Sequence, residues 1–150
     1  MTSHIVFEAL DADRPATCSP TIITGLLREK LGFSGLVFSD CMEMKAIADG
    51  IGTVAATLAA VRAGVDMVLI SHDHDLAHAV IARLVQAQRD GRLDGDAIAA
   101  SRQRLARFCE RFAGQAATPT SLSVLDCEQH RLVVERLIDT GGPVVDPTER

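Results

Sequence analysis

The stretch that most constrains the fold is residues 35–44, GLVFSDCMEM. Residues 36–39 are predicted to form a short strand, because an apolar run bounded by a glycine and a turn is typical of strands buried on both faces of a parallel sheet. The carboxyl ends of such strands face the ligand crevice, and Asp40 stands at that end. Its carboxylate can act as a nucleophile, a general base or a metal ligand. Alternatively, it simply caps the next helix.

Strand and helix patterns alternate along the first part of the chain. The expected strands are residues 1–7, 36–39 and 65–70, and the expected helices are 20–31, 53–63 and 76–89, with a further helix after the N-cap Asp94. Such alternation predicts an α/β fold with parallel strands joined by right-handed crossovers. Three strands are too few to close a barrel, and the sequence opens within one of them. We therefore expect part of a barrel.

The second part of the chain has a different composition. Residues 114–125 are rich in Ala, Thr, Ser and Pro and are expected to be a linker. Asp126, with Gln129 three positions later, resembles a capping box and predicts a last helix, followed by a loose tail to Arg150. The expected organisation is thus a barrel part over residues 1–113, the linker, and a C-terminal helix and tail over residues 126–150.

Charge and cysteine content exclude several functions. The formal net charge is −5 and there is no basic block, which argues against nucleic acid and membrane surfaces as partners. No apolar run approaches the ~18 residues of a membrane span, and there is no charged-then-apolar leader, so we expect a cytoplasmic protein. The four cysteines (Cys18, Cys41, Cys109 and Cys127) form no C-x-x-C pair and are expected to be reduced thiols.

Two further polar positions are candidates for a site. His4 lies at the end of the first expected strand, where it either lines a polar pocket or is a hydrogen-bonded structural group. His72, Asp73, His74 and Asp75 follow the strand at 65–70 and suggest a metal site. Capping of the next helix is the favoured interpretation of this run, because adjacent residues tend to point apart whereas metal ligands must converge. We expect no metal and no cofactor.

Several spaced motifs resemble one family. They are MT-x-H at Met1–His4, ALD at residues 9–11, RPAT at residues 14–17, LR followed by LGFSG at residues 27–35, and SD at residues 39–40 with Met44. In this order they resemble glycoside hydrolase family 3, in particular its bacterial β-N-acetylhexosaminidase branch. The later AGVDMVLISHD run resembles the last barrel strand of that family, so that the resemblance covers residues 1–112.

The resemblance implies a fold, a reaction and a nucleophile. The family has a (β/α)₈ barrel, of which this chain would hold about the last three βα units plus C-terminal helices. Asp40 matches the family's nucleophile in retaining hydrolysis of terminal β-linked N-acetylglucosaminides, here peptidoglycan fragments recycled in the cytoplasm. His4 would be a substrate-binding residue. In retaining enzymes that use two carboxyl groups, these lie about 5–5.5 Å apart; in this branch a His paired with an Asp is the acid/base.

The sequence departs from the family pattern in two respects. It contains no KH-x-PGHG…DSH-like motif, which carries the acid/base, and Cys41 stands where the family usually has Asp. We therefore expect the isolated chain not to hydrolyse the substrate. The alternative hypothesis is a non-catalytic fragment or interaction module that completes a barrel with a separate N-terminal half or by self-association. Exposed strand edges favour such pairing.

Overall fold

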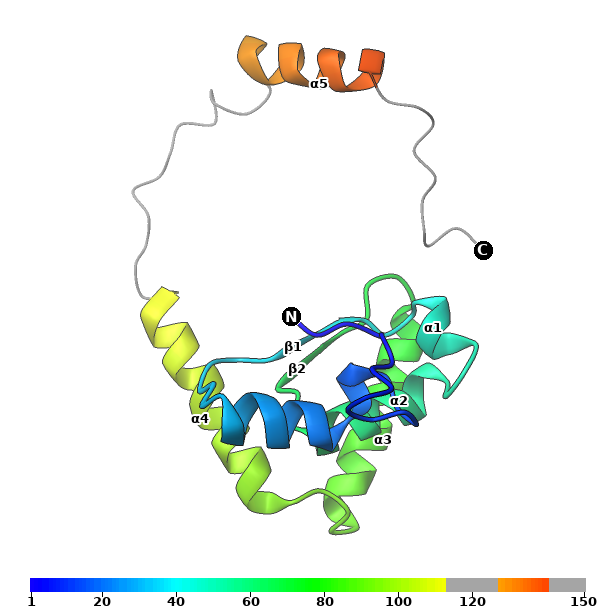
Figure 1. Cartoon of the computed structure of the whole chain (residues 1–150), viewed down its shortest axis with the longest axis vertical. Helices are drawn as coiled ribbons and strands as arrows, with labels where there is room; N and C mark the ends of the chain where they lie inside the picture. The colour runs from blue at the N-terminus through cyan, green and yellow to red at the C-terminus, as the bar shows by residue number, and fades with distance from the viewer. Residues whose placement is uncertain (113–126, 141–150) are drawn as a thin grey trace. The chain divides into compact units, whose positions relative to one another are not determined.

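The computed structural model describes residues 1–112 and 127–140 (Figure 1). These residues fall into two compact units, Met1–Phe112 and Ala113–Arg150, and each unit is considered separately. The expected linker at 114–125, the cap at Asp126 and the tail from 141 onward lie outside the described residues.

The first unit is built on a parallel pair of strands. In Figure 1, β1 (Phe38–Cys41) and β2 (Met67–Leu69) lie side by side. Phe38 pairs with Met67 and Cys41 with Leu69, with a shift of register between the two pairs. The sequence therefore predicted both strands and their parallel pairing. However, β1 begins two residues later than expected, and β2 is shorter than expected. A mixed α/β fold is what the described part of the chain shows.

The N-terminal segment does not form the regular strand expected for residues 1–7. The Thr2 N–H donates to the Phe38 carbonyl at 2.7 Å, so the segment does start beside β1. The Ser3 carbonyl, however, accepts a hydrogen bond from the Thr17 N–H, and the Ile5 carbonyl accepts one from the Ala16 N–H. The segment is thus bonded to the turn of helix η1 (Ala16–Cys18), and Phe7 pairs in an isolated bridge with Asp11 rather than with β1. That part of the prediction is wrong.

Seven helices accompany the strands in the described residues. They are η1 (Ala16–Cys18), the π-helix η2 (Thr21–Lys30), α1 (Lys45–Ala48), α2 (Thr53–Ala63), α3 (His74–Arg89), α4 (Gly95–Phe112) and, in the second unit, α5 (Glu128–Thr140). The expected caps at Asp94 and within the 72–75 run are confirmed, since Asp94 Oδ1 accepts from the Asp96 N–H and Asp73 Oδ1 from the Leu76 N–H. Ser19, whose place before Pro20 also predicts a helix start, accepts from the Ile22 N–H through its Oγ. Each cap satisfies an amide that has no partner within its helix.

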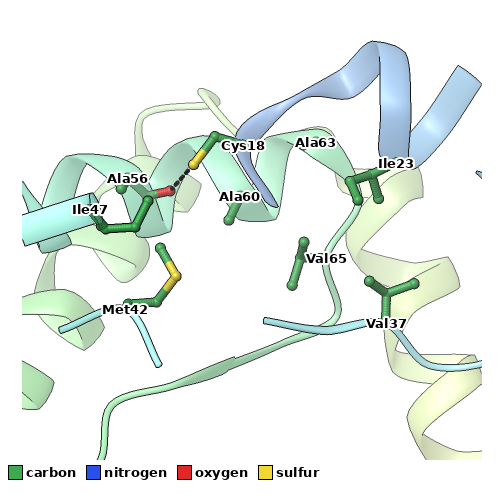
Figure 2. Packing of buried hydrophobic residues seen from close by; sticks show 9 residues of the cluster. All are labelled: Cys18, Ile23, Val37, Met42, Ile47, Ala56, Ala60, Ala63 and Val65. Carbon is green, nitrogen blue, oxygen red and sulfur yellow. Dashed lines mark hydrogen bonds between the residues drawn. The ribbon is translucent and has the colours of Figure 1, made fainter. Parts of the chain in front are cut away.

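Small side chains of α2 make the centre of the core. Ala56, Ala60 and Ala63 are fully buried. Figure 2 shows them in one cluster with Cys18 of η1 and with the residues that flank the two strands, Val37, Met42 and Val65. The spacing of Val54, Leu58 and Val61 predicts that they share one side of this helix, but of the three only Leu58 is buried. Alanines allow the helix backbone to approach its neighbours closely, so the buried face follows the small residues rather than the large ones.

A buried carboxylate links three elements of the first unit. Asp66 Oδ2 accepts from Arg28 Nη2 at 2.7 Å and from the Val37 N–H at 2.9 Å. Its Oδ1 accepts from Arg104 Nη2 at 2.7 Å and Nε at 3.0 Å. Helix α4 has no fully buried residue, and these contacts, with the edge-to-face packing of Phe108 on Phe38, attach it to the rest of the unit.

The second unit contains α5, which confirms the helix expected after the linker. Val133, Val134 and Leu137 are exposed on it. No helix among the described residues is both long and apolar enough to cross a membrane.

Candidate functional site at the ends of the strands

Asp40 is the third residue of β1 and is half-buried. The alternation of the strand turns the preceding residue, Ser39, into the interior, where its Oγ accepts from the Leu69 N–H at 2.9 Å and so joins β1 to β2. Asp40 consequently faces the other way. Its Oδ1 accepts the Cys41 N–H at 2.8 Å, which fixes the carboxylate at the strand end. In the part of the chain that the structure describes, Oδ2 has no recorded hydrogen bond.

His4 lies directly beside this strand end. Its Nε2 is 3.0 Å from the carbonyl oxygen of Cys41, and its Nδ1 is 3.0 Å from Thr17 Oγ1. A carbonyl only accepts, so Nε2 carries a hydrogen. Thr17 is fully buried and also contacts Thr2 Oγ1 at 2.8 Å. Both ring nitrogens are therefore engaged by the protein, and the ring attaches the N-terminal segment to the residue after Asp40. A substrate contact by His4 stays a prediction.

Glu43 connects the loop after β1 to the loop after β2. Its Oε2 accepts from the N–H groups of Ser71 at 2.6 Å and His72 at 3.0 Å, and its Oε1 accepts from Asp73 at 2.9 Å. We call this arrangement the Glu43 clamp. Burial raises the pKa of Glu43, but the three backbone hydrogen bonds and one from Cys41 outweigh it and lower the pKa to about 2. The carboxylate is thus ionised at neutral pH and is no candidate for a general acid.

The structure separates the four residues of the 72–75 run by role. Asp73 caps α3 through Leu76, as the favoured interpretation predicted, and His74 is the first residue of that helix. His72 instead turns back toward the β1 loop, with Nδ1 3.5 Å from Glu43 Oε2. Sequence reasoning missed Glu43, because its partners are backbone amides 28–30 residues away and no local pattern marks it.

Asp40 lies apart from three cavities of the first unit. Three cavities, of about 240, 310 and 360 Å³, are lined mainly by residues of α2–α4 and of the loops that precede the two strands. Asp40 lines none of the three. A carboxylate at a strand end with one oxygen anchored by a backbone amide can act as a nucleophile.

The described part of the chain is therefore a mixed α/β fold with a carboxylate at the carboxyl end of a parallel strand. The family model for the glycosyl hydrolase family 3 N terminal domain matches residues 1–108, and the chain belongs to that family. This confirms the resemblance drawn from the motifs.

Individual relatives agree with the family assignment. The chain is 37% identical over 124 residues to a beta-hexosaminidase of Chromobacterium violaceum, covering 78% of this chain and 34% of the relative. It is 40% identical over 110 residues to a beta-hexosaminidase of Thiobacillus denitrificans, covering 72% and 27%. The chain therefore spans about a third or less of the length of these curated relatives.

Solved structures show the same relation. A glycoside hydrolase family 3 beta-N-acetylglucosaminidase from Paenibacillus sp. str. FPU-7 matches with a TM-score of 0.74 and 36% identity, over 87% of this chain and 26% of that one. The beta-N-acetylglucosaminidase from Thermotoga maritima matches with a TM-score of 0.68 and 32% identity, over 83% and 27%.

Proposed function

We propose that this chain supplies the nucleophile-bearing part of a retaining β-N-acetylhexosaminidase. In this proposal residues 1–113 hold about the last three βα units of the barrel, 114–125 are a linker, and 126–150 are a C-terminal helix and tail. The observation that carries the proposal is the position of Asp40 at the carboxyl end of β1, in a chain that matches the family over residues 1–108. The substrate would be a terminal β-linked N-acetylglucosaminide.

The reaction would proceed in two displacements. An oxygen of Asp40 gives an electron pair to the anomeric carbon while the glycosidic C–O bond breaks, and the leaving oxygen takes a proton from an acid. Water then attacks the same carbon, the bond to Asp40 breaks, and the water proton passes to the conjugate base. Oδ1 is held by the Cys41 amide, so that Oδ2 is the oxygen proposed to attack.

The acid/base is proposed to come from outside the described residues. Glu43 is three positions from Asp40, but its low pKa and its three backbone partners keep it ionised. The family's His–Asp pair resides on a motif that this sequence lacks. The isolated chain is consequently expected to contain the nucleophile Asp40 but not to hydrolyse the substrate.

His4 is proposed to line the sugar pocket. Because both of its ring nitrogens bond to the protein, contact with a sugar would use the carbon edge or the face of the ring. Its second effect is positional, since the bond from Nε2 fixes the Cys41 carbonyl, one peptide unit from the Asp40 side chain.

A chimeric enzyme tests this proposal directly. The matching segment of the Chromobacterium violaceum beta-hexosaminidase would be replaced by residues 1–112 of this chain, and release of an aryl leaving group from its β-N-acetylglucosaminide would be measured. We expect activity in the chimera, a loss of at least about 10³-fold with Asp40→Asn, and little change with the exposed control Asp75→Asn. A folded chimera whose activity survives Asp40→Asn would exclude Asp40 as the nucleophile.

The isolated chain provides the complementary measurement. Purified 150-residue chain is expected to show no turnover of the same substrate. Turnover by the chain alone that disappears in Asp40→Asn would show that an acid/base is present within it. Peptidoglycan fragments as the natural substrate, and a cytoplasmic location, are further parts of the proposal; release of N-acetylglucosamine from such fragments by the chimera, and fractionation of the source cells, test them.

A second candidate function is a barrel-completing interaction module. The observation in its favour is the exposure of large apolar side chains in the N-terminal segment, where Met1, Ile5, Val6, Phe7 and Leu10 are 44–84% exposed. Each Å² of apolar surface left in water costs about 25 cal/mol, so a partner that covers these residues would bind favourably. Sedimentation of the purified chain separates the possibilities: a stable monomer at micromolar concentration excludes self-association, and co-purification with an N-terminal barrel half supports completion.

A further inference from the structure

We propose that Cys41, Glu43 and His72 form a binding site for a thiophilic divalent cation, with zinc as the first choice. The three residues come from two separate loops, the one after β1 and the one after β2. Their ligand atoms (Cys41 Sγ, a Glu43 carboxylate oxygen and a His72 ring nitrogen) all lie within 4.8 Å of one another. The site does not depend on whether the chain acts as a hydrolase.

The distances fit a tetrahedral ion. Zinc bonds of about 2.3 Å to sulfur, 2.0–2.1 Å to imidazole nitrogen and 2.0–2.2 Å to carboxylate oxygen separate the ligand atoms by about 3.6 Å for S···O and about 3.4 Å for N···O at the tetrahedral angle. In the structure, Cys41 Sγ is 3.4 Å from Glu43 Oε2, and His72 Nδ1 is 3.5 Å from the same oxygen. Two of the three edges of the ligand triangle therefore already have the required length.

The central ligand is held in place before any ion binds. The Glu43 side chain is only 8% exposed, and the Glu43 clamp fixes its orientation through three backbone N–H groups. Partners of this kind orient a metal ligand and raise affinity, in the way that hydrogen bonds to ligands do at known metal sites.

The other two ligands are reachable from solvent. Cys41 is half-buried, and the His72 side chain is 61% exposed, so the His72 ring is free to adjust the third edge, which is at most 4.8 Å. On binding, the thiol that now donates to Glu43 loses its proton to solvent, sulfur and nitrogen each give an electron pair to the ion, and water fills the fourth position. A thiolate, an imidazole and a carboxylate together favour zinc over magnesium or calcium, which take oxygen ligands.

The site would join the loops that follow the two strands. Cys41 is adjacent to Asp40, and His72 precedes α3, so an ion held by both residues ties the end of β1 to the start of α3. The Glu43 clamp makes this connection already, and a metal would reinforce it beside the candidate nucleophile.

Zinc titration of the full 150-residue chain tests the proposal. A chromophoric chelator of known affinity would compete for zinc, and cobalt would be used in parallel to detect the charge-transfer absorption of a thiolate–cobalt bond. We expect one equivalent of zinc at micromolar affinity or tighter, with the cobalt band present. Cys41→Ser should abolish the band, and Cys41→Ser and His72→Ala should each weaken zinc binding by at least about tenfold, the low end of the loss seen even for an outer-shell partner.

Two matched variants serve as controls. Cys109→Ser removes a cysteine that is exposed on α4, and His74→Ala removes an exposed histidine two residues from His72; neither should change the titration. Absence of zinc binding at micromolar concentration would overturn the proposal. So would binding that survives both Cys41→Ser and His72→Ala, or that is lost with either control variant. If Cys41→Ser fails to fold, the exposed His72→Ala variant decides.

Discussion

The contacts of Asp66 predict a large loss of stability on Asp66→Asn. The Asp66 side chain is 1% exposed, and the two arginines that bind it, Arg28 and Arg104, are 14% and 15% exposed. The two carboxylate oxygens accept three hydrogen bonds from the guanidinium groups and one from the Val37 amide, besides one from Ser101. Removing the charge leaves two largely buried cations without their partner.

The magnitude follows from the number of bonds that asparagine cannot replace. Its one side-chain oxygen can still accept from one side, but its NH₂ group faces donors on the other, so about two of these bonds are lost. Hydrogen bonds to charged groups contribute about 1.5–3 kcal/mol each, and breaking a buried ion pair costs about 3–5 kcal/mol. We expect the free energy of unfolding to fall by about 3 kcal/mol.

Urea denaturation followed by circular dichroism measures this change. With a slope of about 1.5 kcal/mol per molar urea, the midpoint should fall by about 2 M. Asp90→Asn is the matched control, because Asp90 and Arg92 also form a 2.7 Å pair but are both 39% exposed; it should change stability by less than about 1 kcal/mol. Equal effects of the two substitutions would refute the reasoning that burial sets the cost.

The same carboxylate predicts a pH dependence. Burial raises the pKa of Asp66, but the hydrogen bonds from Arg104, Val37 and Ser101 and the charge of Arg28 outweigh it and hold the pKa below its usual value of 3.8. A depressed pKa means that the stabilisation is present above the unfolded-state pKa and is lost as the pH falls through the folded-state pKa. Stability should therefore decline in acid below about pH 4, and Asp66→Asn should flatten that decline.

Three further substitutions test separate parts of the fold. Glu43→Gln should speed hydrogen exchange at the amides of residues 71–73 by about tenfold and lower the free energy of unfolding by about 1–2 kcal/mol. In the parent chain, the stabilisation by the Glu43 carboxylate should be lost as the pH falls from 4.5 through about 2. Thr57→Val should raise the free energy of unfolding by about 1 kcal/mol, and with it the urea midpoint, because the Thr57 hydroxyl is buried without a partner. A lower midpoint would contradict this. Gly64→Ala should cost about 1–2 kcal/mol or more by the same assay, since Gly64 has φ +103° and an added Cβ would lie 2.9 Å from Thr24 Oγ1; an unchanged midpoint would show that the helix end can move.

Local features of the fold could be predicted from the sequence, and long-range ones could not. The bounds of α2 agree with the expectation from Thr53 to Ala63, because a glycine ends the helix and small residues fill it. The capping roles of Ser19, Asp73 and Asp94 were likewise visible, since a cap acts within three residues of itself. The limits of β1 were not, because a strand extends only as far as its neighbour provides hydrogen bonds.

The candidate site divides in the same way. Asp40 was identified by its place after an apolar run, a signal contained in neighbouring residues. The Glu43 clamp and the ion pairs of Asp66 join residues separated by 28–38 positions, and no spacing rule connects such distant residues. Family resemblance did not reveal them either: Asp66 lies within the AGVDMVLISHD run, but that resemblance carried no information about its partners, and Glu43 was not one of the matched motif positions.

The Glu43 clamp determines which substitutions the loop after β2 can tolerate. A carboxylate that binds main-chain amides recognises no side chain, so Ser71 and His72 are free to vary as far as the clamp is concerned. Proline is the exception, because it has no N–H to donate. The conformation of the loop after β2 thus depends on a residue about thirty positions earlier, Glu43. A library that randomises positions 71 and 72 should keep the parent stability in most members without proline, while one that randomises position 43 should be destabilised in most members, by about 1–2 kcal/mol.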